Sequence, residues 1–254
     1  MNCRTLYPCF SILIALVASA DEPQSDSTLL PVSVVKPVEF VDGTFAGNVT
    51  AEEIGGMGRR ELKLDGGHSH DFVTKDGETV ETRTLTAYRD AILGGGTLDN
   101  GYATACASRF VEGWSIWEFL RHAKPARLSH FDKDWMGTLS VDLVGWIGSA
   151  ERKRREADVK AGKSLSDYSK SDGVRCLTIG EKTSTFEAHR SHRIEWLAAG
   201  DVNGDGIEDR LILVHYWDPE GSASIKETCV VTRSSASVSC STVRPFLEKN
   251  IAAR

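Results

Sequence analysis

The last third of the chain alternates apolar and polar positions in short runs, the pattern of antiparallel β-strands. Residues 211–214 (Leu-Ile-Leu-Val) are apolar at every position, as expected of a central strand that is buried on both faces. We therefore expect an antiparallel β region over residues 173–254. Its predicted strands are 174–179, 183–189, 193–199, 210–217, 225–233 and 237–243.

Residues 30–105 also carry strand signals, but prolines and glycines interrupt them. Four valines between positions 32 and 38 predict one or two short strands. Pro31 and Pro37 would keep these strands at a sheet edge, because proline cannot donate to a ladder. Asp76-Gly77 predicts a hairpin turn between the runs 71–74 and 79–85. This region is therefore expected to be rich in β-structure.

Residues 106–172 are predicted to form a region of short helices. Ser115 can cap a helix that runs to Ala123 and is stopped by Pro125. Ser140 can start a second short helix, and a third is expected over 150–161, closed by a glycine. The third helix has almost no apolar face, so we interpret it as a solvated surface helix. A basic docking patch is the alternative interpretation.

Together these patterns predict an α+β chain. It would have a β-rich N-terminal part, a middle segment of short helices and a C-terminal antiparallel sheet. Residues 30–254 could form one domain with a common core, and the pattern leaves open whether they do. No repeat of roughly 20–50 residues is visible, which argues against a solenoid or a propeller.

The first twenty residues have the pattern of a signal peptide. Arg4 precedes the apolar run 10–18, and Ala18-Ser19-Ala20 supplies the small residues that a signal peptidase accepts. The run is too short to cross a bilayer, which needs about 20 apolar residues. We expect residues 21–29 to be a disordered lead-in. The mature protein is expected to be exported to the periplasm or the extracellular space, without a transmembrane segment.

Charge and cysteine content fit an exported protein. The formal net charge of −6 argues against nucleic acid as a partner, because phosphate binding needs a basic surface. An even number of cysteines follows the predicted signal peptide, as expected in an oxidising compartment. Cys229 and Cys240 are equidistant from the Ser-Ser pair 234–235, so a hairpin turning there would allow a disulfide. Cys106 and Cys176 are then left for a second disulfide.

One stretch, 200–209 (Gly-Asp-Val-Asn-Gly-Asp-Gly-Ile-Glu-Asp), carries oxygen-bearing side chains at the spacing that a hard cation needs. Ca²⁺ collects about 6–8 oxygen ligands from a tightly curled backbone. Gly206 permits the sharp turn after the third candidate ligand, and Ile207 would contribute its carbonyl oxygen. The candidate side chains are those of Asp201, Asn203, Asp205 and Asp209.

This stretch lies between two predicted strands and is therefore placed at the tip of a β-hairpin. An EF-hand would need flanking helices and a glutamate at the twelfth position, which is Ile212 here. The pattern instead resembles the Asp-x-Asn-Gly-Asp-Gly-x-x-Asp loop of FG-GAP/VCBS-type repeats, in a single copy over residues 194–217. The propeller fold is not implied, because one blade cannot close a propeller.

The resemblance implies a structural Ca²⁺ held in the hairpin turn. Its ligands would be Asp201, Asn203, Asp205, Asp209 and the carbonyl oxygen of Ile207. A hairpin turn without a metal is the alternative. We favour the metal because four oxygen side chains this close together repel one another when no cation is present.

Histidines form a second candidate metal cluster. His68, His70 and Asp71 lie close together in the sequence, and His189 and His192 add a second pair. Together they could hold Zn²⁺, which binds nitrogen and sulfur ligands, and the protein would then be a secreted metal-dependent hydrolase. The interpretation we favour is that these histidines face solvent or are satisfied in loops, because no His-Glu-x-x-His motif is present.

The leading functional hypothesis is an exported, non-enzymatic calcium-binding protein. It would recognise a protein partner or an envelope polymer, by analogy with inhibitor and immunity proteins. No Gly-x-Ser-x-Gly motif is found in the sequence. Four tryptophans of the middle region predict core packing first and a partner-binding surface second; they are Trp114, Trp117, Trp135 and Trp146. The secreted hydrolase stays the alternative.

Overall fold

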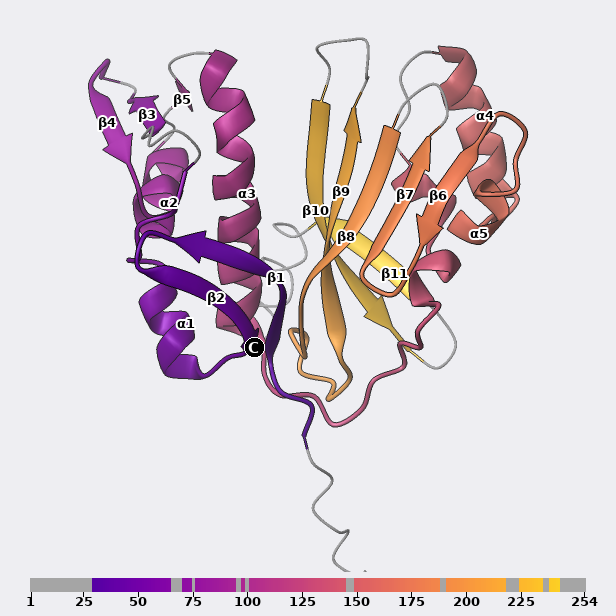
Figure 1. Cartoon of the computed structure of the whole chain (residues 1–254), viewed down its shortest axis with the longest axis horizontal. Helices are drawn as coiled ribbons and strands as arrows, with labels where there is room; N and C mark the ends of the chain where they lie inside the picture. Colours follow the sequence, from indigo (N-terminus) through magenta and orange to yellow (C-terminus); the bar gives the residue numbers. More distant parts are fainter. Residues whose placement is uncertain are drawn as a thin grey trace, which may run out of the picture.

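The described residues form a main antiparallel sheet with helices on both sides of its central strands (Figure 1). The structure is a computed structural model. It describes residues 29–64, 70–74, 76–94, 97–98, 101–144, 149–187, 191–217, 224–234 and 238–242. The predicted signal peptide and residues 21–28 of the predicted lead-in lie outside these ranges. The prediction of an α+β chain with a C-terminal antiparallel sheet is confirmed.

Eight described strands belong to the main sheet. Six of them follow the order β11-β10-β9-β8-β1-β2. β7 also pairs with β8, and β6 pairs with β7. Their bounds are β1 Ser33–Phe40, β2 Gly43–Asn48, β6 Arg175–Ile179, β7 Thr183–Glu187, β8 Ser191–Gly200, β9 Asp209–Trp217, β10 Ser224–Arg233 and β11 Val238–Thr242.

A small second sheet and the helices complete the described fold. The small sheet has the order β4-β3-β5, with β3 His70–Val73, β4 Thr79–Thr82 and β5 Thr97–Leu98. The α-helices are α1 Ala51–Met57, α2 Leu85–Leu93, α3 Gly101–His122, α4 Ser149–Lys160 and α5 Leu165–Tyr168. Two 3₁₀ helices are η2 Trp135–Thr138 and η3 Val141–Leu143. None of the described helices is both long and apolar enough to span a membrane.

Two strands, β7 and β1, pair with different parts of the same edge of β8. On one edge, β9 pairs with β8 from Ser191 to Gly200. On the other edge, β7 pairs with residues 191–195 and β1 with Ala198 and Ala199. The N-terminal hairpin β1–β2 therefore extends the C-terminal sheet, so the first and last parts of the described chain share one sheet.

Successive residues of β9 enter two different hydrophobic cores. Leu211 and Leu213 belong to the core formed with α1, α2 and α3, whereas Ile212 and Val214 belong to the core on the opposite face. All four side chains are buried. The prediction that this strand is buried on both faces is confirmed, and the alternation of strand side chains explains how it serves both cores.

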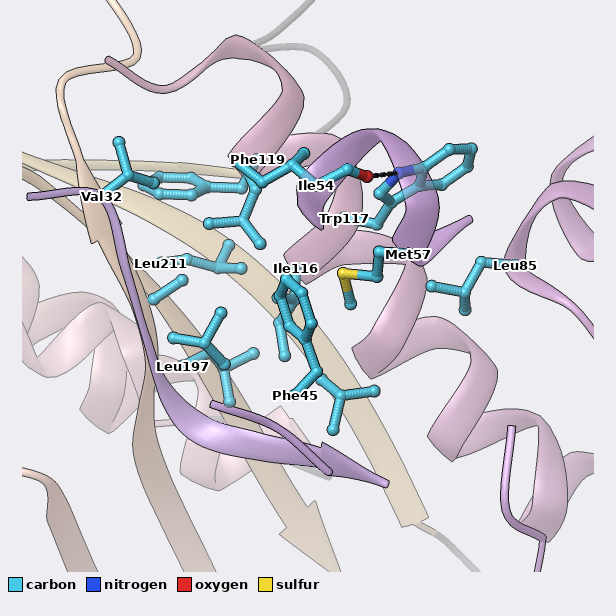
Figure 2. Close-up of a cluster of buried hydrophobic side chains, with 14 of the residues drawn as sticks. Val32, Phe45, Ile54, Met57, Leu85, Ile116, Trp117, Phe119, Leu197 and Leu211 are labelled. Atoms are coloured by element: carbon cyan, nitrogen blue, oxygen red, sulfur yellow. Dashed lines mark hydrogen bonds between the residues drawn. The ribbon is translucent and has the colours of Figure 1, made fainter. Parts of the chain in front are cut away.

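The first core lies between the main sheet and α1, α2 and α3 (Figure 2). Ile116 and Phe119 of α3 belong to the same buried cluster as Leu211 of β9. The indole Nε1 of Trp117 donates to the carbonyl oxygen of Ile54 in α1 at 3.2 Å, which ties α1 to α3. A buried tryptophan with a satisfied N–H is a typical core residue.

The second core lies on the other face, under η2, η3 and α5. Trp135, Leu165 and Phe186 are fully buried in it. Trp135 Nε1 donates to the carbonyl oxygen of Glu181 at 2.9 Å. The core-packing interpretation is therefore confirmed for the buried Trp117 and Trp135, and Trp114 is half-buried against the first core. Trp146 lies outside the described residues.

The prediction that Ser115 begins a helix is wrong. Helix α3 already begins at Gly101, and Ser115 lies inside it, buried, with its Oγ 2.9 Å from Oγ1 of Thr228 in β10. The region 30–105 also holds α1 and α2 in addition to its strands. Their N-termini are capped by Thr50 and Thr84, whose side chains accept backbone N–H bonds.

The two later helix predictions are close to the structure. Ser140 caps η3 by accepting from the N–H of Asp142. Helix α4 covers most of the predicted range 150–161, and Gly162 follows it with φ +69°. The described side chains of α4 are mostly exposed, as predicted, but Arg155 is buried.

The strand predictions in the N-terminal part are confirmed in one place and corrected in another. β3 and β4 form the predicted hairpin, with Gly77 at φ +80°. The expectation that Pro37 keeps its strand at a sheet edge is wrong for β1 as a whole, which pairs with both β2 and β8, although β1 pairs with β8 only at Ser33 and Val34. Pro37 instead lies at an irregularity between Val34 and Val38, where no ladder bond is required of it.

The predicted pairing of Cys229 directly opposite Cys240 is also wrong. The β10–β11 register places Cys229 opposite Thr242, and Cys240 opposite Val231. The two cysteines are diagonal neighbours, whose separation exceeds what a disulfide spans without a register shift. Cys229 and Cys176 are free thiols in this structure, while the side chains of Cys106 and Cys240 lie outside the described residues.

If the two cores share one sheet, they should unfold together. Leu120→Ala in the first core and Leu139→Ala in the second should each lower the free energy of unfolding by about 2–5 kcal/mol in a single transition. Leu93→Ala, at a side chain that is 61% exposed, is the control and should change it by less than about 0.5 kcal/mol. Urea denaturation followed by circular dichroism measures this. Two separate transitions, each sensitive to only one variant, would contradict a shared folding unit.

Candidate functional site

The acidic loop, defined here as residues 201–209, joins β8 to β9. Gly200 pairs with Asp209, so the loop lies at the tip of a hairpin, as predicted. Gly204 and Gly206 have φ +84° and +83°. These left-handed conformations are costly for residues with a Cβ, so the two glycines permit the loop to curl.

The carboxylates of Asp201 and Asp209 accept hydrogen bonds from the loop's own backbone. Asp201 Oδ1 accepts from the N–H of Gly204 at 2.6 Å, and its Oδ2 accepts from the N–H of Gly206 at 2.9 Å. Asp209 Oδ2 accepts from the N–H of Val202 at 3.0 Å. These bonds draw both ends of the loop inward.

Asn203 and Asp205 form the outer part of the same network. Asn203 Oδ1 accepts from the N–H of Asp205 at 2.9 Å, and Asn203 Nδ2 donates to Asp205 Oδ2 at 3.0 Å. Asp205 Oδ1 accepts from the N–H of Ile207 at 2.7 Å. The structure therefore places every predicted ligand residue in one short loop.

The loop carries buried negative charge. Asp201 is 4% exposed and Asp209 is 1% exposed. Burial, followed by the nearby carboxylates of Asp205 and Asp201, raises the pKa of Asp209 to about 7, although backbone N–H groups oppose the rise. Among the described residues, no group of three or more His, Cys, Asp or Glu side chains is arranged to hold a metal ion. Asp201, Asp205 and Asp209 therefore do not converge as a ready metal site in this structure, and a calcium ion would have to draw them together.

The loop is bound to the segment that connects α3 to η2. Asp201 and Lys124 exchange two backbone hydrogen bonds, at 2.8 and 2.9 Å, and the N–H of Arg127 donates to the carbonyl of Gly206 at 2.8 Å. Because α3 lies in the first core and η2 in the second, the loop braces the connection between the two helical layers.

Arg210, the cationic residue next to the acidic loop, already has an acidic partner and aromatic neighbours. Arg210 is buried, and its Nε lies 2.8 Å from a carboxylate oxygen of Glu208. Its guanidinium carbon lies 3.8 Å from the ring centroid of Trp196, 4.3 Å from that of Phe131 and 4.7 Å from that of Trp135. Stacking among three rings fixes Arg210 within the second core.

The described part of the predicted histidine cluster is divided between two sheets. His70 and Asp71 belong to β3 in the small sheet, whereas His192 is buried in β8 of the main sheet. The ring of His192 lies 6.2 Å, centroid to centroid, from that of Tyr216. His68 and His189 lie outside the described residues.

Sequence reasoning missed an ionic cluster between α3 and the main sheet. Glu112 of α3 accepts from Lys36 of β1 at 2.8 Å and from Lys226 of β10 at 3.0 Å. Lys36 also donates to Glu195 of β8 at 2.9 Å. A cavity of about 330 Å³ adjoins these groups and is also lined by Arg109. Partners this distant in the chain leave no local signal in the sequence.

The ionic cluster keeps Glu112 and Lys36 charged. Burial alone would raise the pKa of Glu112, but Lys36 and Lys226 outweigh it and lower that pKa below its ordinary value. Burial opposes the charge of Lys36 too, but Glu112 and Glu195 outweigh it and raise the pKa of Lys36. Charge-assisted hydrogen bonds therefore hold α3 directly against β1 and β10, and Lys36 links this contact to β8.

No protein-family model matches this chain, and no curated protein or solved structure shows significant similarity to it. The acidic loop and the ionic cluster are therefore interpreted from their own geometry and chemistry.

The ionic cluster predicts an acid-sensitive contribution to stability. A carboxylate whose pKa is lowered by folding stabilises fully above its unfolded-state pKa, near 4.5, and loses that contribution as the pH falls through the folded-state value. Glu112→Gln should lower the free energy of unfolding by about 1–3 kcal/mol at neutral pH, and by clearly less at about pH 3. Urea denaturation at both pH values measures the difference.

Glu156→Gln is the control, because Glu156 is in an exposed ion pair with Arg152. Its effect should be about 0.5 kcal/mol or less at neutral pH. An effect of Glu112→Gln that is equally large at both pH values would contradict the electrostatic account.

Proposed function

We propose that the acidic loop binds a calcium ion which stabilises the β8–β9 hairpin and its contact with the segment that connects α3 to η2. The observation that carries this proposal is the burial of Asp201 and Asp209 beside Asp205, while the adjacent Arg210 is occupied by Glu208. Like charges held this close are destabilising unless a cation compensates them.

The donor set suits a hard cation. An ionised carboxylate has about four acceptor sites, so the hydrogen bonds within the loop leave lone pairs for a metal. Ca²⁺ prefers carboxylate, amide and carbonyl oxygens and takes about 6–8 of them. The ligands we propose are Asp201, Asn203, Asp205, Asp209 and the carbonyl oxygen of Ile207, the set that the FG-GAP/VCBS resemblance implies.

The role proposed for this calcium is structural. The protein would then be an exported binding protein that acts in the periplasm or outside the cell and recognises a protein partner or an envelope polymer. Support for export comes from the sequence pattern of residues 1–20 and the even number of cysteines that follow it. Extracellular calcium is abundant enough to fill sites with dissociation constants of about 10⁻⁴–10⁻³ M.

Calcium should raise the melting temperature of the protein above its value in chelator. A ligand that binds only the native state adds about 2.7 kcal/mol of stability when its concentration is 100 times its dissociation constant. Asp205→Asn should abolish most of this shift, because asparagine keeps an acceptor for the N–H of Ile207 but removes the charge. Differential scanning calorimetry with calcium and with chelator measures the shift.

The matched control is Asp76→Asn, at an exposed aspartate in the β3–β4 hairpin turn, which should keep the full calcium shift. A wild-type melting temperature that does not change between chelator and millimolar calcium would overturn the proposal. An undiminished shift in Asp205→Asn would mean that the ligand set is wrong.

A further inference from the structure

A second polar cavity lies beside α4 and α5, the two helices at the right of Figure 1. Its volume is about 600 Å³, and it shares no lining residue with the acidic loop. Charged side chains dominate its wall, among them Arg154, Arg155, Asp158, Lys163 and Lys170. Any ligand that fits such a wall must itself be polar.

Arg155 distinguishes this cavity from an ordinary surface hollow. Helix α4 is mostly exposed, but the side chain of Arg155 is only 5% exposed. Its guanidinium carbon lies 4.3 Å from the ring centroid of Tyr168, which is itself buried. Its Nε and Nη1 atoms are buried and have no hydrogen-bond partner among the described residues. A buried cation without hydrogen-bonding partners is costly, so an anion is expected nearby.

Among the described residues, the acid nearest to Arg155 is Asp158, which does not form a hydrogen bond with it. Asp158 lies 3.8 Å from Nη1 of Arg155, beyond hydrogen-bond distance, but only 2.7 Å from Nζ of Lys163. Asp167, which also lines the cavity, accepts from the backbone N–H and the hydroxyl of Ser164. Asp158 and Asp167 thus have closer partners than Arg155.

We propose that this cavity binds a small, polar carboxylate, whose negative charge pairs with Arg155. The wall holds four basic and three acidic side chains, which leaves one positive charge in excess. A singly charged carboxylate matches this excess, whereas a phosphate, with a charge of about −1.5 to −2 at neutral pH, exceeds it. The volume suits a ligand of roughly monosaccharide to disaccharide size, and Tyr168 holds the guanidinium in place before binding.

Isothermal titration with glucuronate tests this inference on the full chain, with glucose as the neutral analogue and inorganic phosphate as the competing oxyanion. Glucuronate should bind the wild type, glucose should not bind, and phosphate should bind at least about tenfold more weakly than glucuronate. Arg155→Gln should weaken glucuronate binding at least about tenfold. Lys153→Gln removes a charge from an exposed position of α4 outside the cavity wall and should leave binding unchanged.

Lys163→Gln is a second test variant in case Arg155→Gln does not fold, because Lys163 is substantially exposed. Releasing Asp158 from Lys163 lets it pair with Arg155, so glucuronate should again bind more weakly. The proposal is overturned if the wild type does not bind glucuronate, if phosphate binds more tightly, or if neither variant weakens binding. Loss of the calcium-dependent melting shift would not affect this result, since the two sites share no residue.

Discussion

The fold depends on the burial of the β8–β9 pair on both of its faces. Leu211 and Ile212 are neighbours in the chain, but each is fully buried in a different core. A strand that is apolar on both faces does not select its own register, because a slip by one residue exchanges one apolar set for another. The turn must therefore set the pairing of these strands, and that turn is the acidic loop.

The hydrogen bonds of the acidic loop stabilise this turn, whereas its buried negative charges destabilise it. Its carboxylates cap N–H groups on both sides of the turn, and its backbone is bonded to Lys124 and Arg127 between the two helical layers. Buried Asp201 and Asp209 nevertheless repel each other. A bound cation would convert this repulsion into attraction. We therefore propose that calcium has a structural role in stabilising the sheet and is not part of a reaction centre.

Local patterns predicted the features that depend on local chemistry. The apolar run of β9, the hairpin around the acidic loop and the cap at Ser140 follow from side-chain alternation, glycine conformation and a hydroxyl before a helical turn. The start of α3 did not follow, because Ser115 has the chemistry of a cap but is bonded to Thr228 in a distant strand. The ionic cluster at Glu112 and the buried Arg155 were missed for the same reason: long-range packing determines both.

Hydrogen–deuterium exchange with and without calcium tests the central claim most directly. If a calcium ion fixes the acidic loop, the backbone amides of residues 201–209 and of the bonded segment 124–128 should exchange more slowly with calcium than with chelator. The β3–β4 hairpin, in the separate small sheet, should exchange at the same rate in both conditions. Equal exchange of the acidic loop with calcium and with chelator would contradict the account.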